Sequence, residues 1–135
     1  MAGTPPSVIP TLRYRDAPGA IRWLVDVFGL TESFVAPGPD GTIAHAQLVI
    51  GTGMVMLSSE SDGSDGRLAV PHGPTWLYVV LDSEEDLAAH YKRATAAGAE
   101  ILQPLRAEDY GGSGYTARDQ EGNVWSFGTY RPEMS

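Results

Sequence analysis

Few side chains in this sequence have the types and spacing that catalysis or metal binding requires. His45 and Gln47 are two residues apart in a run that alternates like a β-strand, so both should lie on one face. An imidazole there could anchor a ligand, act as a general base, or form one arm of a metal site. It could equally hydrogen-bond within the sheet or at a dimer contact. Because no carboxylate partner is evident, catalysis is the less favoured interpretation.

Arg13 is the candidate for charge recognition. An arginine pointing into an apolar cleft needs an anion, from ligand or protein, to offset its desolvation. The alternatives are a salt bridge to a nearby acid or a side chain that reaches solvent. Of the other histidines, His72 lies in a polar stretch and His90 in a helical one, and we expect both at the surface.

Two tyrosines, Tyr110 and Tyr115, flank a glycine-rich stretch within residues 107–115. Mobile glycines and large aromatic side chains are typical of a loop that closes over a pocket, although an ordinary connection has the same composition. The stretch is not a phosphate cradle, since no lysine or helix start follows it. A Gly-x-Ser-x-Gly nucleophile motif is missing, and the absence of cysteine excludes disulfides and thiolate chemistry.

Composition excludes several classes of protein. The net charge is −8 and the pI about 4.6, so no basic stripe exists to bind nucleic acid or an anionic membrane surface. No apolar run approaches membrane-spanning length. The first residues have neither a basic region nor an apolar stretch, so no secretory signal is visible. We predict a cytoplasmic protein that binds neither nucleic acid nor membranes.

The elements that must position these side chains occur twice. Residues 10–16 form a strand-like run that ends in an acid, and residues 76–82 repeat it. Each run precedes a helical stretch, then a glycine (Gly29 or Gly98), then three strand-like segments. In the second copy, strands are expected near 100–104, 114–118 and 123–130. Such a duplication predicts an α+β fold of two βαβββ modules, which form a curved mixed sheet around a cleft.

The expected organisation is a single domain over residues 1–135, as the length suggests. It consists of a module at 8–59 and a module at 75–130, joined by a polar linker at 60–74.

The order of these elements resembles the vicinal oxygen chelate superfamily, which includes glyoxalase I, the bleomycin resistance proteins and extradiol dioxygenases. The resemblance covers about residues 8–132. Its motifs are Arg15-Asp16…Ala20-Ile21…Phe28-Gly29 and Asp119-Gln120-Glu121-Gly122-Asn123-Val124-Trp125-Ser126-Phe127. It implies paired modules, a pocket inside the curved sheet, and a homodimer in which the modules either pair within one chain or swap between chains.

The resemblance also bears on cofactors. Metal enzymes of the superfamily place His, Glu or Gln ligands on cavity-facing strand positions, which fall near Ile9, Met56, Trp76 and Ser126 here. None of these side chains is a plausible ligand for a hard or borderline divalent metal. The resemblance therefore implies a protein with no metal and no cofactor.

Strand alternation from those positions gives a pocket that is apolar and aromatic with a few polar anchors, as for flat or greasy ligands. The alternative is that the same side chains simply fill a core. No catalytic residue is assigned. The predicted ligand-binding residues are Arg13, His45, Gln47, Met54, Met56, Trp76, Tyr78, Tyr110, Tyr115 and Ser126.

We therefore expect a metal-free small-molecule-binding protein that resembles bleomycin resistance and glyoxalase-like proteins. Its ligand would be an aromatic or amphipathic metabolite or antibiotic. One alternative is a glyoxalase-like lyase, isomerase or dioxygenase, with a displaced metal site or a metal-independent mechanism that uses His45 or Tyr110. A second alternative is a structural module whose cleft is closed by side chains.

Overall fold

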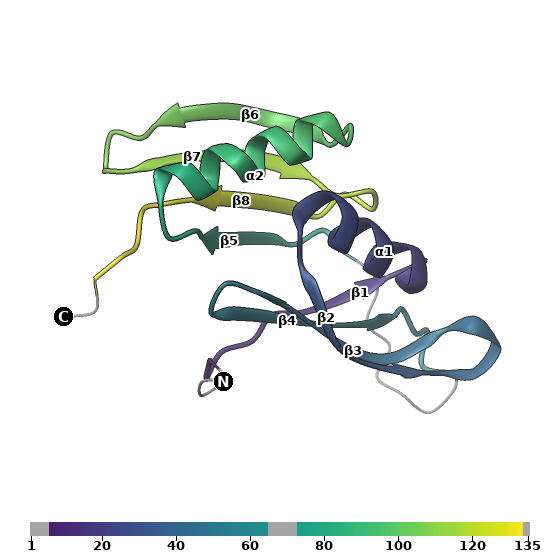
Figure 1. The fold of residues 1–135 in the computed structure, drawn as a ribbon. Helices are drawn as coiled ribbons and strands as arrows, with labels where there is room; N and C mark the ends of the chain where they lie inside the picture. The colour runs from purple at the N-terminus through teal and green to yellow at the C-terminus, as the bar shows by residue number, and fades with distance from the viewer. Residues whose placement is uncertain (1–5, 65–72, 134–135) are drawn as a thin grey trace. The chain divides into compact units, whose positions relative to one another are not determined.

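A computed structural model describes residues 6–64 and 73–133. The chain forms two compact units, residues 1–74 (unit 1) and 75–135 (unit 2), and each repeats the same order of elements (Figure 1). Unit 1 contains β1 (Thr11–Tyr14), α1 (Ala17–Phe28), β2 (Thr31–Pro37), the short 3₁₀ turn η1 (Pro39–Gly41), β3 (Ile43–Ile50) and β4 (Gly53–Ser59). Unit 2 contains β5 (Trp76–Val80), α2 (Glu84–Ala96), β6 (Glu100–Ala107), β7 (Ser113–Arg118) and β8 (Val124–Gly128).

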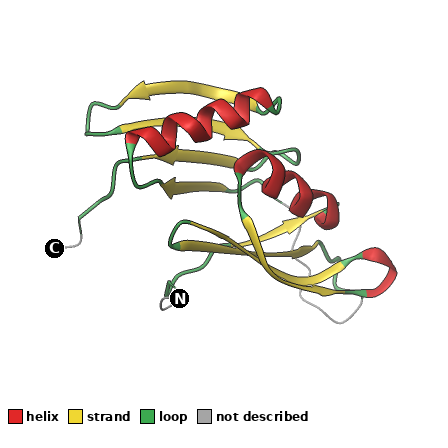
Figure 2. Cartoon of the chain, in the orientation of Figure 1, coloured by secondary structure: helices red, strands yellow, loops and turns green. Residues whose placement is uncertain are grey.

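The predicted pair of βαβββ modules is confirmed. Each unit has its own four-stranded mixed sheet, ordered β1-β4-β3-β2 in unit 1 and β5-β8-β7-β6 in unit 2 (Figure 2). In both, the first strand runs parallel to the last, and the other neighbours are antiparallel. Most of the predicted linker, including His72, lies outside the described residues.

A polar side chain caps the N-terminus of each helix. The Asp16 carboxylate accepts a hydrogen bond from the Gly19 N–H at 3.0 Å, and the Ser83 hydroxyl accepts one from the Asp86 N–H at 3.0 Å. Gly29 ends α1 with φ +74°, the left-handed conformation that favours glycine.

Each sheet buries one face under its own helix. In unit 1, α1 contacts all four strands, and Leu12, Leu48 and Leu57 lie in the core. In unit 2, α2 packs on β6 and β7, and Trp125 and Phe127 are fully buried. Because side chains alternate along a strand, the residues between these point to the other face, which the helix does not cover.

Strand β6 is longer than predicted. It continues past Pro104 to Ala107, beyond the expected end at residue 104. Proline is tolerated here because β6 is an edge strand and because its pairing with β7 shifts register between Gln103 and Arg106.

The glycine-rich stretch is a tight turn between β6 and β7. The Glu108 N–H donates to the Gly112 carbonyl at 2.9 Å, and the Gly111 N–H donates to the Glu108 carbonyl at 3.1 Å. Gly112 has φ +69°, and a Cβ there would lie 2.6 Å from Thr129 Oγ1, so the turn needs glycine. This segment is thus a short hydrogen-bonded connection between two strands.

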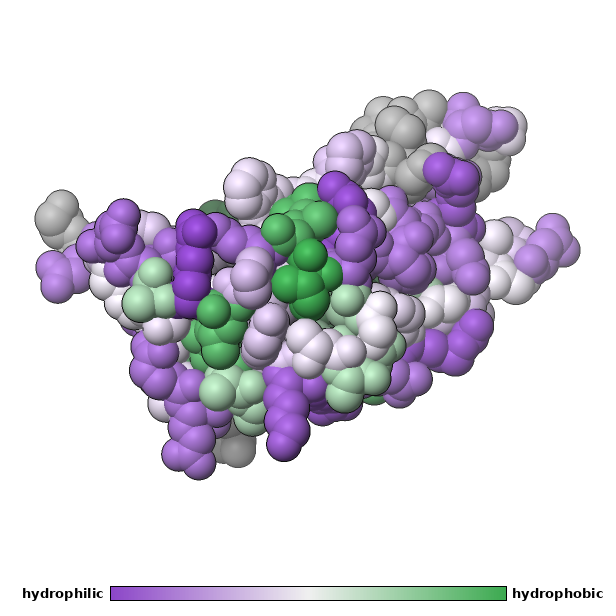
Figure 3. Space-filling view, turned by 90° about the horizontal axis from the view of Figure 1, so that it is seen from above, coloured by the Kyte–Doolittle hydropathy of each residue, from purple (hydrophilic) through white to green (hydrophobic). Residues whose placement is uncertain are grey.

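The surface view in Figure 3 shows mainly hydrophilic and neutral side chains, with hydrophobic ones in a few small groups. Small groups of this kind are normal on protein surfaces. Neither of the two helices in the described parts of the chain has the length and hydropathy needed to span a membrane.

Candidate functional site

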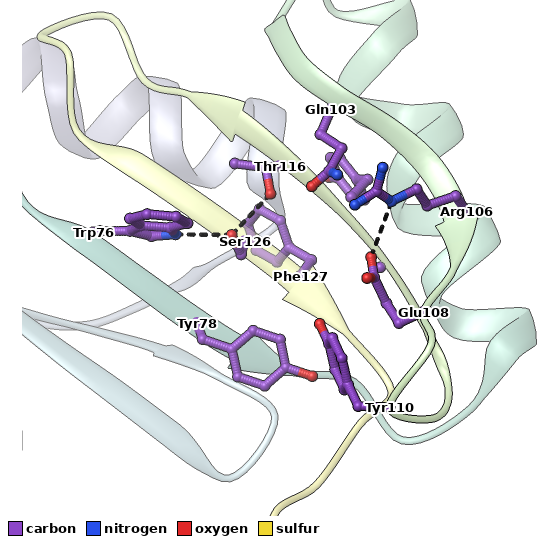
Figure 4. Close-up of a pocket in the computed structure, with 11 residues that line it drawn as sticks. Trp76, Tyr78, Gln103, Arg106, Glu108, Tyr110, Thr116, Ser126 and Phe127 are labelled. Carbon is purple, nitrogen blue, oxygen red and sulfur yellow. Dashed lines mark hydrogen bonds and ion pairs between the residues drawn. The ribbon is translucent and has the colours of Figure 1, made fainter.

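The helix-free face of the unit 2 sheet holds an open pocket of about 420 Å³. All four strands and the β6–β7 turn contribute to it (Figure 4). The lining residues are Trp76, Tyr78, Gln103, Arg106, Glu108, Tyr110, Gly114, Tyr115, Thr116, Ser126 and Phe127.

Trp76 forms one wall and is held in place by a short chain of hydrogen bonds. Its indole N–H donates to the Ser126 hydroxyl at 2.9 Å, and Ser126 Oγ lies 2.8 Å from Thr116 Oγ1. The side chain nevertheless remains 73% exposed. An aromatic ring with a fixed orientation and a free face is suited to stacking on a flat ligand.

Tyr78 lies next to a pair of facing glycines, Gly114 on β7 and Gly128 on β8. A Cβ on Gly128 would lie only 2.8 Å from Tyr78 Oη, so glycine at this position makes room for the ring. Tyr78 donates a 2.5 Å hydrogen bond to the Tyr130 carbonyl. Partial burial, and then the neighbouring phenol of Tyr110, raise the pKa of Tyr78, so its hydroxyl remains a donor at neutral pH.

A polar group closes the other end of the pocket. Arg106 Nε lies 3.4 Å from Glu108 Oε1, and the Glu108 side chain is only 13% exposed, against 57% for Arg106. The Gln103 amide fits this group with its oxygen toward Arg106, where it accepts from Nη1 at 2.7 Å. Tyr110 completes the rim, with its ring packed edge-on against Tyr130 at 4.9 Å between centroids.

Tyr115 and His90 meet on the other side of the sheet. The Tyr115 side chain is 1% exposed, and its hydroxyl lies 2.6 Å from His90 Nδ1 on α2. Tyr115 therefore borders the pocket while its ring packs toward the helix. Burial, and then the neighbouring phenol of Tyr91, raise the pKa of Tyr115. The expectation of a surface position for His90 is wrong, because its half-buried ring packs on Phe127 at 4.2 Å between centroids.

The predicted residues of unit 1 share the sheet face that α1 does not cover. Register places Gln47 opposite Met56, and Met54 is two residues along the same strand. His45 Nε2 lies 2.9 Å from Gln47 Oε1, so the two side chains hydrogen-bond to each other. Among the described residues, no carboxylate contacts His45.

Arg13 lies on the same face of unit 1, opposite Ser58 in register. Its guanidinium has one long hydrogen bond, 3.4 Å to the Ser59 carbonyl. No salt bridge from Arg13 to an acid is found within residues 6–64 and 73–133, so that alternative is not seen there.

The positions that the resemblance to the superfamily assigns to metal ligands carry unsuitable side chains in both units. In unit 1 they fall at Ile9 and Met56, and in unit 2 at Trp76 and Ser126, which hydrogen-bond to one another. An alkyl chain, a thioether, an indole N–H and a neutral hydroxyl do not fit a divalent metal of the hard or borderline class. Over the described parts of the chain, no three His, Asp or Glu side chains gather as a metal site would require.

The Asp-x-x-Gly-Asn motif has a structural role. Asp119 is buried and accepts hydrogen bonds from the Asn123 N–H at 3.0 Å, the Glu121 N–H at 2.9 Å and Trp125 Nε1 at 3.1 Å. The Asn123 amide oxygen accepts from the Thr75 N–H at 2.9 Å. The motif thus fixes the β7–β8 turn to the start of β5, next to Trp76.

Six residues that line the pocket are not among the predicted ligand-binding residues: Gln103, Arg106, Glu108, Gly114, Thr116 and Phe127. The Arg-x-Glu spacing of a complementary pair was the available signal for two of them.

Several known proteins resemble this chain in sequence or in structure. A sequence model of the Glyoxalase/Bleomycin resistance protein/Dioxygenase superfamily matches residues 8–127. An uncharacterized protein of Mycobacterium bovis is 32% identical over 126 residues, which span 91% of this chain and 82% of that protein. The crystal structure of TioX from Micromonospora sp. ML1 is 35% identical, covers 96% of this chain and 100% of its own, and has a TM-score of 0.79.

More distant structures share the fold alone. Lactoylglutathione lyase from Agrobacterium tumefaciens is 21% identical, with a TM-score of 0.66 over 93% of this chain and 95% of that one.

Proposed function

This chain belongs to the Glyoxalase/Bleomycin resistance protein/Dioxygenase superfamily, and we propose that it binds an aromatic or amphipathic small molecule without a metal ion. The ligand is a metabolite or an antibiotic, and its flat part lies in the unit 2 pocket. The family includes both enzymes and binding proteins, so the proposal depends on the site rather than on the family name.

The observation that carries the proposal is the fixed, exposed ring of Trp76 at a pocket of about 420 Å³. A side chain that only filled a core would be covered, whereas Trp76 is 73% exposed and still held by Ser126. Tyr78 and Tyr110 add two more exposed aromatic side chains at the same pocket. Aromatic walls with a few polar groups are typical of small-molecule sites.

The chemistry of the donor set supports binding without a metal. At the family's ligand positions in unit 2, the Trp76 N–H and the Ser126 hydroxyl bond to one another. Neither offers a charged or strongly basic donor. Metal-assisted chemistry would need other ligands than those that the family uses.

The unit 1 residues complete the proposed set. Arg13, His45, Gln47, Met54 and Met56 share one sheet face, and we infer that they take part in ligand binding. We also infer that residues 1–135 act as one domain, form a homodimer and work in the cytoplasm. Light scattering coupled to size-exclusion chromatography tests the dimer, and a monomeric mass at micromolar concentration would contradict it.

Calorimetric titration with 1-naphthalenemethanol, a neutral aromatic probe, tests the binding function. We expect saturable binding that weakens about tenfold or more in Trp76→Ala, because that variant removes the stacking surface. Trp23→Phe is the matched control, since Trp23 belongs to α1 in unit 1. No saturable binding, or binding that Trp76→Ala leaves unchanged, would overturn the proposal.

A further inference from the structure

Glu108 places a poorly compensated carboxylate inside the unit 2 pocket. Its side chain is 13% exposed, and Oε1 has one ionic contact, to Arg106 Nε at 3.4 Å. Among the described residues, Oε2 has no hydrogen bond or ion pair. Removing a carboxylate from water costs free energy unless hydrogen bonds or a counter-charge replace the lost hydration.

Arg106 offsets that cost only weakly. Charge-assisted N–H···O bonds are normally about 2.7–2.9 Å long, shorter than this one. The guanidinium is 57% exposed, and its Nη1 faces the Gln103 amide oxygen at 2.7 Å rather than the carboxylate. Figure 4 shows Glu108 between Arg106 and Tyr110, with the Arg106 side chain turned toward Gln103.

The other walls of the pocket attract cations as well. Trp76, Tyr78 and Tyr110 are all exposed aromatic residues that line it, and the faces of such rings are negative. A net charge of −8 adds a longer-range attraction for positive ligands.

Building on the proposed function, we propose that this pocket selects ligands in which a protonated amine is attached to an aromatic or apolar body. The ammonium group donates to Glu108 Oε2, and the apolar body lies against Trp76. An anionic ligand would meet the Glu108 carboxylate first. A cation in contact with Oε2 is closer to the carboxylate than to the solvent-screened guanidinium of Arg106, so attraction outweighs repulsion.

Three probes of similar shape test this selectivity in calorimetric titrations at pH 7.5. They are 1-naphthylmethylamine, 1-naphthalenemethanol and 1-naphthoate, which carry positive, zero and negative charge. We expect the amine to bind about tenfold more tightly than the alcohol, and the carboxylate to bind most weakly.

Glu108→Gln should remove the preference for the amine over the alcohol, because it removes the negative charge that the ammonium group contacts. Glu85→Gln is the matched control. It removes the same charge from an exposed position on α2, on the other side of the sheet, and should preserve the preference for the amine.

The outcomes separate the two proposals. If the alcohol or the carboxylate binds at least as tightly as the amine, and Trp76→Ala still weakens binding about tenfold or more, the cation preference is wrong and the binding function stands. If none of the three probes binds, both are wrong. The comparison of probes on the unmodified protein does not depend on the folding of any variant.

Discussion

The indole N–H of Trp76 donates a 2.9 Å hydrogen bond to the hydroxyl of Ser126, across the parallel strands β5 and β8. The resemblance to the superfamily assigns both residues to positions where its metal enzymes carry ligands. In this chain the bond orients an aromatic ring that can act as a stacking surface.

Ser126→Ala tests whether this bond orients the ring for binding. The variant removes the acceptor and frees the indole to rotate, which should weaken binding of 1-naphthalenemethanol about fivefold. The free energy of unfolding should fall by only about 1 kcal/mol, because Trp76 is largely exposed. Calorimetry and urea denaturation measure the two effects. Affinity equal to that of the unmodified protein would show that orientation is irrelevant.

Gly128→Ala tests whether glycine at this position is needed to make room for the Tyr78 ring. The new methyl group would lie 2.8 Å from Tyr78 Oη and 2.9 Å from the Ser113 carbonyl, so the ring and backbone must move. We expect a loss of about 1–3 kcal/mol in the free energy of unfolding, together with weaker binding.

Gly53→Ala is the matched control for Gly128→Ala. A Cβ at Gly53 would meet its nearest neighbour, the Ile50 carbonyl, at an ordinary 3.5 Å. Equal stability of the two variants in urea denaturation would contradict the steric argument.

Asp119→Ala tests the structural role of the β7–β8 turn. The buried carboxylate accepts from two backbone N–H groups and from Trp125 Nε1, and its removal leaves those donors without this acceptor. We expect a loss of about 2–4 kcal/mol in the free energy of unfolding. The exposed Asp109, changed to alanine, should alter it by less than about 0.5 kcal/mol. A similar small effect at Asp119 would refute this role.

Regular strands made much of the fold predictable from the sequence. Alternation separates the buried Leu12, Leu57, Trp125 and Phe127 from their exposed neighbours, because a strand repeats every two residues. The caps Asp16 and Ser83 are local features as well, since their side chains bind backbone groups within one turn of the helix.

The polar end of the pocket was not predictable in this way. Gln103 and Arg106 are three residues apart and would face opposite sides of a regular strand. Both line the pocket because the register shift around Pro104 reverses the alternation.

His90 was misplaced for another reason. His90 lies three residues after the buried Leu87, on the face of α2 that packs against the sheet. This position partly buries the side chain despite its polarity.

Elemental analysis tests the metal-free proposal. Protein purified without chelators or added metal should contain less than about 0.1 equivalent of any divalent transition metal per chain, because the donors at the family's positions are too weak. Added Zn²⁺ or Ni²⁺ should leave the midpoint of thermal unfolding unchanged. One tightly held ion per chain would overturn the proposal and favour the enzymatic alternative with displaced ligands.

The free energy of unfolding should fall at high pH because Tyr115 must lose its proton. Burial raises the pKa of its phenol in the folded protein above the ordinary value of about 10. The stabilising contribution is thus complete below pH 10 and is lost as the pH rises, because the unfolded chain releases the proton first. Urea denaturation between pH 8 and 11 measures this slope. Tyr115→Phe should flatten the pH dependence, because phenylalanine has no phenolic proton to release. It should also lower the free energy of unfolding by about 1 kcal/mol at pH 8, because it removes the hydrogen bond to His90. Identical slopes for both proteins would show that another group governs the alkaline loss of stability.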